Sequence, residues 1–544
     1  MRRRNERSDE GKRVWKIWRR LGILIILAAL TGLLCLVFGC VFREWNSLPR
    51  AMTGDGWEQN RDEDDISVSP REFAEICTEL ECFLEERGIT ETWQWKREEA
   101  VWERIERVMA CDGRELSGDD AFLYQELVYV GELRGREREL PDYYNYLSET
   151  EGVLNELWMY AATEQGSYGG SEALAAWVTE ASRALLRQQE VGRLYPASQL
   201  GDAITQCRQL LEEELPGSDI RLREAVEKLL SCLEELEGTE EITGLCQLPM
   251  GGAYYDVLLE WETGSGLTAK EMYDSLSELR EALSMELSDM EGQDAGSRLQ
   301  NADAGQLLAL LEENTRLQFG YTGEESYELR EMPEALGGRT YVGFYKKDLA
   351  SDSHVVYIEQ SRVHQNAYEK YEILAHEGFP GHLFFQICQQ QRPYAGLRCC
   401  LSGKGCREGW AVYSEFLAAQ WLEEDREGYR AFLIRKLLDE VILSQMDIGI
   451  HSFGWDQSRL TDYCREVYGE IRPEGVTAVG VKLSGQPAMY LSYAVGYMKV
   501  CELERAYMEI GHSREEFVEW FLRYGQTAFT MIEEYAKTPG SGCP

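Results

Sequence analysis

The chain has 544 residues, of which 44% are hydrophobic and 28% are charged. This is ordinary globular composition, which excludes a fibrous or broadly disordered protein. The formal net charge of −40 argues against nucleic acid as a partner, because phosphate contacts need lysine and arginine. The 15 cysteines form no CxxC pair and no regular framework, so we expect mostly free thiols.

The N-terminus has the pattern of a membrane anchor. Residues 1–20 carry nine Lys/Arg and three Asp/Glu, and residues 21–42 carry no charge. A helix over 21–42 would be roughly 33 Å long, enough to cross a bilayer core. The basic flank predicts a cytoplasmic tail at 1–20, a transmembrane signal anchor at 21–42, and an extracytoplasmic remainder of a single-pass cell-membrane protein. The alternatives are lipoprotein cleavage before Cys40 and a cleaved signal peptide, and both also place residues 43–544 outside the cytoplasm.

Beyond the anchor, the sequence predicts a mainly α fold. Residues 43–65 are polar and broken by Pro and Gly, as in a linker. Residues 66–316 place apolar residues at helical spacing, with acidic residues on the solvated faces. In the region 317–544, a β-rich stretch predicts a small sheet of two or three strands from RTYVGFYKKDL and SHVVYIEQS. Helix then returns, so we expect one large helical domain over 66–544, in two halves.

The segment HEGFPGH at 376–382 carries the strongest chemical signal. Two histidines and a carboxylate are usual ligands of a catalytic zinc, and His followed by Glu begins the helical HExxH motif. Here the second histidine, His382, follows His376 by six residues instead of four. Pro380 and Gly381 lie between them and would break or bulge a helix. A bulge that absorbs two residues would return His382 to the face of His376.

A third ligand is predicted in CREGWAVYSEF, residues 406–416. Glu408 and Glu415 are seven residues apart, which places both carboxylates on one face of a helix. Glu408 is the candidate metal ligand. Glu415 is the candidate hydrogen-bond acceptor for a ligand imidazole. The alternative is a pair of surface glutamates in a Glu-rich protein.

Together, HEGFPGH, REGWAVYSE and PAMYLSYAVGYMK (487–499) resemble an uncharacterised bacterial family, domain of unknown function 885. Its members share these three motifs in this order, and the resemblance covers about 340–500. The family is similar to helical zinc peptidases of the thermostable carboxypeptidase and thimet oligopeptidase type. The resemblance therefore implies a helical, metallopeptidase-like domain, with 66–316 as its N-terminal half and 317–544 as its catalytic half.

The resemblance implies roles for individual residues. Zn²⁺ would be held by His376, His382 and Glu408, and Glu377 would be the general base. Tyr493 would stabilise the developing oxyanion, with Tyr490 as the alternative donor. Two positions depart from the family pattern: Leu383 and Met489 stand where many members have His and Gln.

Three further residues are candidates for substrate contact. Tyr341 and Phe344 lie in a predicted edge strand near the active-site cleft, where an extended peptide can add by main-chain hydrogen bonds. Lys499 is a candidate for a substrate carboxylate. His354 and His364 flank the strands, and we expect them to be structural.

The resulting expectation is a membrane-anchored, extracytoplasmic zinc metallopeptidase. It would hydrolyse short peptides with metal-activated water. The alternatives are a zinc hydrolase of a non-peptide amide or ester, and a catalytically inactive surface binding protein. The sequence does not specify the oligomeric state.

Overall fold

The computed structural model describes residues 66–536, except 88, 90–93, 95, 97, 164–169, 216, 218, 291–298, 300–301, 322, 324–325, 339–341, 349–352, 364–366, 402 and 424. The described residues from Ser67 onward form one compact unit. The predicted basic tail, membrane anchor and linker lie outside the described residues. In the part of the chain that is described, no helix is both long and apolar enough to span a bilayer.

The first half is helical, as predicted, and its helix starts follow local capping rules. Ser69 with Glu72, and Thr268 with Glu271, form capping boxes in which each side chain satisfies a free backbone amide. The helices are α2 (Pro70–Glu86), α4 (Glu99–Met109), α5 (Gly118–Arg138), α6 (Val153–Thr163), α7 (Gly170–Glu190), α8 (Ala197–Gln209), α9 (Ile220–Glu235), α10 (Gly251–Thr263), α11 (Ala269–Asp289) and α12 (Ala304–Phe319). Helix α12 runs through the predicted 316/317 boundary without a break.

Short strands and turns lie between these helices. They are strands β1 (Ile66–Ser67), β2 (Cys111–Asp112), β3 (Tyr195–Pro196) and β4 (Gly238–Thr239), a π-helical turn at Leu210–Glu214, and 3₁₀ turns at Leu245–Gln247 and Glu334–Leu336. Strands β3 and β4 pair in parallel.

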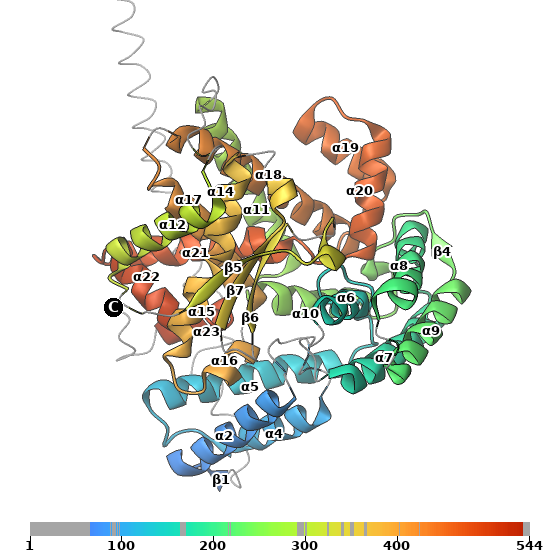
Figure 1. Ribbon diagram of the computed structural model, residues 1–544, viewed down its shortest axis with the longest axis horizontal. Helices are drawn as coiled ribbons and strands as arrows, with labels where there is room; N and C mark the ends of the chain where they lie inside the picture. The colour runs from blue at the N-terminus through green and yellow to red at the C-terminus, as the bar shows by residue number, and fades with distance from the viewer. Residues whose placement is uncertain are drawn as a thin grey trace, which may run out of the picture. The chain divides into compact units, whose positions relative to one another are not determined.

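The predicted small sheet has three strands, β5 (Tyr327–Glu331), β6 (Gly343–Asp348) and β7 (Ser353–Ile358). Their order is β5-β7-β6, with β5 parallel and β6 antiparallel to the central strand. The burial of β7 is nearly continuous, which suits a central strand. Strand β6 is an edge strand, and the sheet lies at the centre of Figure 1.

Helices resume after the sheet, as predicted. They are α13 (Gln360–Val363), α14 (Ala367–Glu377), α15 (His382–Gln390), α16 (Ala395–Leu401), α17 (Lys404–Ala419), α18 (Arg426–His451), α19 (Gln457–Tyr468), α20 (Pro473–Gly485), α21 (Leu491–Glu509), α22 (Arg514–Tyr524) and α23 (Phe529–Ala536). The described cysteines are all free thiols, in line with the expectation from their spacing.

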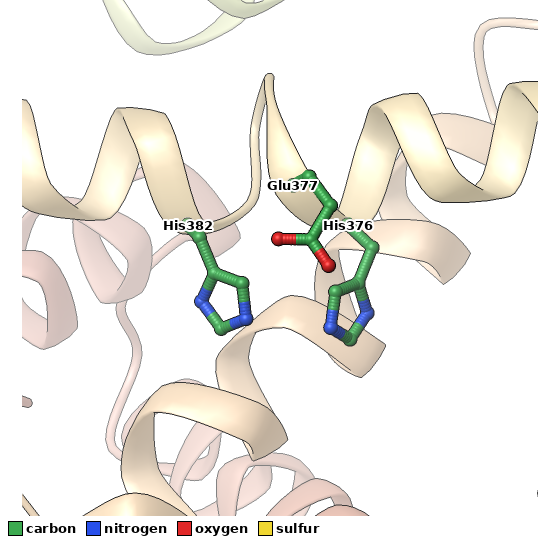
Figure 2. Close-up of side chains that lie close together, drawn as sticks. All are labelled: His376, Glu377 and His382. Carbon is green, nitrogen blue, oxygen red and sulfur yellow. The ribbon is translucent and has the colours of Figure 1, made fainter. Parts of the chain in front are cut away.

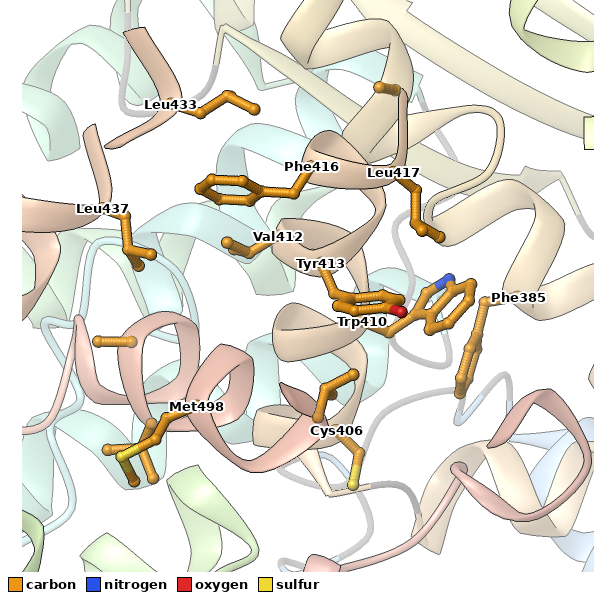
Figure 3. Packing of buried hydrophobic residues seen from close by; sticks show 14 of the residues in the cluster. Phe385, Cys406, Trp410, Val412, Tyr413, Phe416, Leu417, Leu433, Leu437 and Met498 are labelled. Carbon is orange, nitrogen blue, oxygen red and sulfur yellow. The ribbon is translucent and has the colours of Figure 1, made fainter. Parts of the chain in front are cut away.

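Helix α17 is the centre of the largest hydrophobic core. Trp410 is fully buried and stacks on Phe521, and Phe416 and Leu417 extend the same cluster (Figure 3). This core also takes residues from α10, α11 and α12 of the first half, so the two predicted halves share it. Helix α17 is thereby fixed on nearly every side.

The backbones of α17 and α21 are in close contact where they cross. A Cβ atom on Gly409 would lie 2.2 Å from the carbonyl carbon of Gly496, and one on Gly496 would lie 2.2 Å from the carbonyl oxygen of Gly405. No side chain fits at such a distance, so glycine is required at these positions. The contact places the helix of Glu408 directly beside the helix of Tyr493.

Candidate metal centre

The two histidines of HEGFPGH sit on two different helices. Helix α14 ends at Glu377 and α15 begins at His382. The predicted bulge within one helix is therefore a complete break, although the predicted consequence holds. Figure 2 shows the side chains of His376, Glu377 and His382 on the same side of the break. The imidazole centroids of His376 and His382 are 4.8 Å apart, with the rings nearly perpendicular at 86°.

Gly381 makes this tight connection possible. A Cβ atom there would lie 1.8 Å from the carbonyl oxygen of His376 and 2.4 Å from that of Ala375. Only glycine allows the returning chain to pass so close to the end of α14. The local sequence thus forces His382 back towards His376.

Glu408 completes a set of three ligand atoms. Its Oε2 lies 3.6 Å from Nε2 of His376 and 3.4 Å from Nε2 of His382. Ligands about 2.1 Å from a tetrahedral ion lie about 3.4 Å from one another. The two distances from Glu408 therefore match those between ligands of a single small ion. Glu377 also offers an oxygen within 4.8 Å of the histidine ring nitrogens.

A second layer of charged groups holds His376 in place. Its Nδ1 is 2.7 Å from Oε1 of Glu415, which leaves Nε2 facing Glu408 and His382. Glu415 also accepts from the Lys436 ammonium at 2.9 Å, and Lys436 forms a further short hydrogen bond with Glu372. The Glu415 side chain is only 1% exposed. A carboxylate behind a ligand imidazole fixes its tautomer and orientation.

The electrostatics of this cluster favour a cation. Burial alone would lower the pKa of His376, but hydrogen bonds with Glu408 and Glu415 raise that pKa well above its usual value. Burial alone would raise the pKa of Glu408, but His382 and His376 hold that pKa well below its usual range. A site that stabilises added positive charge on His376 also favours a metal ion beside it.

The Glu377 carboxylate is oriented by the edge strand. Its Oε2 accepts the backbone N–H of Tyr345 in β6 at 2.9 Å. The Tyr345 side chain turns to β7, where its hydroxyl lies 2.6 Å from Nδ1 of the buried His354. The sheet therefore fixes the carboxylate that follows His376 directly in the chain. His354 has the structural role that its position predicted.

The two candidate oxyanion donors lie at the start of α21. The half-buried ring of Tyr493 stacks on His376 with a centroid separation of 6.4 Å. Tyr490 is also half-buried and packs beside Ile442 and Met446. Of the two tyrosines, Tyr493 is the one with a ring contact to a candidate ligand.

The predicted substrate contacts are more scattered. Phe344 stacks on Tyr357 of β7 and packs against a second hydrophobic cluster, which is formed mainly by residues of the first half. Lys499 pairs with Glu502 and Glu533, so two carboxylates already compensate its charge. Tyr341 and His364 lie outside the described residues.

A pocket lies one helical turn from Glu408. Lys404 lines it from α17, and its ammonium pairs with Glu151 and Glu262 at 2.9 and 2.8 Å. Pro487 and Met489, from the third sequence motif, form another part of the wall. The pocket therefore lies between the first half of the chain, the start of α17 and the third motif.

Three residues at this centre were not found by sequence reasoning. They are Tyr345, Glu372 and Lys436. Glu372 precedes His376 by one helical turn, and that spacing was the one available signal. Lys436 lies in a helix rich in Lys, Arg, Asp and Glu, where its sequence context resembles that of any solvated side chain.

The fold and this cluster define a mainly helical protein with a His/Glu centre suited to a metal ion. The chain belongs to the family described as "Bacterial protein of unknown function (DUF885)", whose model matches residues 161–534. The predicted resemblance to that family is thereby confirmed. No curated protein matches the chain.

Solved structures are similar to this one at low sequence identity. One, described as a "putative lipoprotein" of Colwellia psychrerythraea, is 14% identical with a TM-score of 0.65, and the match covers 86% of this chain and 98% of that one. Another, described in the same words and as "of unknown function", is from Shewanella oneidensis; it is 13% identical with a TM-score of 0.50, covering 86% and 99%. A Pyrococcus furiosus carboxypeptidase, described as "Apo-Mg", is 11% identical with a TM-score of 0.42, covering 88% and 92%.

Proposed function

We propose that this chain is a metal-dependent hydrolase, and specifically a zinc peptidase that acts on short peptides. One observation carries the proposal: the Glu408 carboxylate lies 3.6 and 3.4 Å from Nε2 of His376 and His382, as ligands of one ion would, with Glu415 behind His376. Two imidazoles and one carboxylate form the usual protein ligand set of a catalytic zinc, which keeps one position open. Bound zinc supplies Lewis acidity, which polarises a substrate carbonyl and acidifies water.

The chain's own residues account for the proton transfers. Glu377 takes a proton from the attacking water and passes it to the leaving amine. The N–H of Tyr345 keeps one oxygen of Glu377 in place and leaves the other for this task. The Tyr493 hydroxyl donates to the oxyanion as it develops.

The same proposal places the protein outside the cytoplasm, attached to the membrane. The uncharged stretch at 21–42 behind a basic tail supports it. The description of two structurally similar proteins as lipoproteins is consistent with this location. Phase separation with detergent tests the attachment in cells that express the full chain. A variant that carries Lys at three positions within 21–42 is the control.

The first test is metal content, with His376→Ala as the variant and His354→Ala as the matched control. About one zinc per native molecule, retained in the His354 variant and lost in the His376 variant, is the expected result. Absence of metal from all three proteins after zinc is added would remove the basis of the proposal.

The second test is peptide cleavage by the zinc-loaded protein. Glu377→Gln is expected to lower kcat by about 10²–10⁴-fold while zinc stays bound, because the proton acceptor is lost and the ligands are kept. A library of short peptides beside non-peptide amides and esters identifies the substrate class. Cleavage of esters alone would replace the peptidase by another hydrolase, and equal rates for Glu377→Gln and the native protein would exclude the assigned base.

A further inference from the structure

One face of α18 runs along the metal centre. Lys436 lies at one end of this face, where its ammonium contacts Glu415 behind His376. Asp447 lies three turns further on, and both its carboxylate oxygens accept the backbone N–H of Ala488, at 3.1 and 2.9 Å, in the turn before Tyr490. Glu440 is one turn from Lys436, so helical geometry places it on the same face between these two contacts.

The Glu440 carboxylate is left without a hydrogen-bond partner on one side. Its Oε2 is buried and receives no hydrogen bond from the described residues. The nearest cation on the helix, Lys436, already donates to Glu372 and Glu415. A buried carboxylate oxygen without a donor is costly, and such groups commonly mark a place where a ligand binds.

Glu440 is electrostatically part of the metal centre. Burial raises the pKa of Glu440 to about 7; Lys436 opposes this rise, and Glu415 adds to it. His376 and Glu408 also act on this carboxyl, and Glu440 in turn contributes to the raised pKa of Tyr490. The charges of two candidate metal ligands therefore act on Glu440, and the charge of Glu440 acts on one candidate oxyanion donor.

The charges of the centre do not balance. The positive charges here are the Lys436 ammonium and, in the metal-loaded protein, one divalent ion. Against them stand five carboxylates, those of Glu372, Glu377, Glu408, Glu415 and Glu440. Burial raises the pKa of Glu372 to about 8 and that of Glu440 to about 7, so these are the two carboxyls whose charge the centre compensates least. Lys436 donates to Glu372, and a positive charge brought by the substrate would stabilise the ionised form of Glu440.

We propose that Glu440 binds a primary ammonium group of the substrate. The inference rests on the proposed function and narrows its substrate class to peptides with a free amino group close to the scissile bond. That ammonium is either the peptide's own N-terminus or a lysine side chain. Its three donors suit the carboxylate oxygen that no described residue satisfies.

The test compares Glu440→Gln with Asp439→Asn, which removes a charge from the exposed side of the same helical turn. Substrates are a short peptide with a free N-terminus, its N-acetyl form, and an N-acetyl form with lysine beside the scissile bond. We expect native protein and Asp439→Asn to prefer a peptide with an ammonium by tenfold or more in kcat/KM. Glu440→Gln should keep its zinc and lose that preference, because its kcat/KM falls much more for the peptides with an ammonium than for the N-acetyl peptide.

The three substrates distinguish the two sources of the ammonium. If the acetylated peptide is cleaved well only when it carries lysine, the lysine side chain is the source of the ammonium. If acetylation abolishes the preference with and without lysine, the source is the N-terminus. Equal cleavage of all three by the native protein overturns the inference and leaves the peptidase proposal intact. A Glu440→Gln variant that slows all three equally also overturns it, because the residue would then act on the centre and not on the ammonium.

A binding measurement separates this inference from the hydrolase proposal. Calorimetry on Glu377→Gln, with and without zinc, uses the same three peptides as ligands. We expect at least one of the two peptides with an ammonium to bind at least tenfold more tightly than the N-acetyl peptide without lysine, and the double variant with Glu440→Gln to bind all three equally. Equal binding of all three by Glu377→Gln itself overturns the inference, whether or not the native protein cleaves peptides.

Discussion

The helix pair α7 and α9 and the helix pair α14 and α17 place their charges in opposite ways. Helix α7 buries Leu174, Val178 and Leu185, while Glu172 forms an ion pair with Arg221 of α9 in which both side chains are 77% exposed. In the second pair, the side chains of His376 and Glu415 are 10% and 1% exposed. Burial of charge is costly even when the partners are in place. The first pair keeps its charges in solvent, and the second buries them at the candidate metal centre.

The sharpest way to test this contrast is to break the buried network. Glu415→Ala is expected to lower the free energy of unfolding by about 3–5 kcal/mol, because Lys436 and His376 lose their shared acceptor. Zinc affinity should fall by about 10–100-fold, since the His376 ring is no longer held. Urea unfolding and zinc titration measure the two effects. Glu415→Gln, which keeps one acceptor, should lose less of both, and a loss below 1 kcal/mol for Glu415→Ala would contradict this account.

The glycine crossing gives the next largest effect. Gly409→Ala puts a Cβ atom 2.2 Å from the backbone of Gly496 and should cost about 3 kcal/mol, at the upper end of overpacking. Gly201→Ala in α8 is the control from the first half, because a Cβ atom there meets nothing within 4 Å. It should stabilise by about 0.5–1 kcal/mol through helix propensity. Thermal unfolding measures the change in stability of both variants. Changes of the same sign would contradict the close contact between α17 and α21.

A third prediction concerns pH and the buried His451. Its Nδ1 accepts the N–H of Leu245 and its Nε2 lies 3.0 Å from the carbonyl of Leu483, so both nitrogens are satisfied in the neutral form. Burial lowers the pKa of His451 to about 4. The unfolded chain, with a pKa near 6.5, binds the proton first, so the contribution to stability is complete above pH 6.5 and declines as pH falls to 4.

The size of that decline is about 3 kcal/mol, from a pKa difference near 2.5 at 1.4 kcal/mol per unit. His451→Gln removes the titrating group and is the reference. Urea unfolding at several pH values measures the difference in unfolding free energy between the native protein and the variant. As the pH falls from 6.5 to 4, the native protein should lose stability relative to the variant. A difference that stays constant over this range would show that His451 is protonated in the folded state.

The smallest effect is expected at the exposed pair of the first half. Glu172→Ala should change the free energy of unfolding by less than about 0.5 kcal/mol, because solvent screens the partner Arg221. Adding salt should leave even this difference near zero. A loss comparable to that of Glu415→Ala would remove the distinction between the two helix pairs.

Periodicity and motif spacing predicted much of this molecule. Helix on both sides of a small sheet followed from the apolar pattern, and the candidate set His376, His382 and Glu408 followed from ligand chemistry and motif resemblance. The helix break was only partly foreseen, because the sequence shows a proline and glycine but not that α15 restarts at His382.

The rest depends on tertiary contacts that leave no local trace. Lys436 and Glu440 occupy the same kind of helical sequence as exposed residues, and only the packing of α18 turns them inward. The N–H that Tyr345 gives to Glu377 is a backbone group, and its position is set by the register of β6 on β7. Sequence alone names no backbone donor.

The contact between Gly409 and Gly496 also has a consequence for motion. Because α17 and α21 touch through their backbones, Glu408 and Tyr493 are carried by what is mechanically a single rigid piece. Thermal fluctuations of the surrounding elements then leave the distance between Glu408 and Tyr493 unchanged. Any motion that opens or narrows the candidate centre has to take place in the segments around this helix pair.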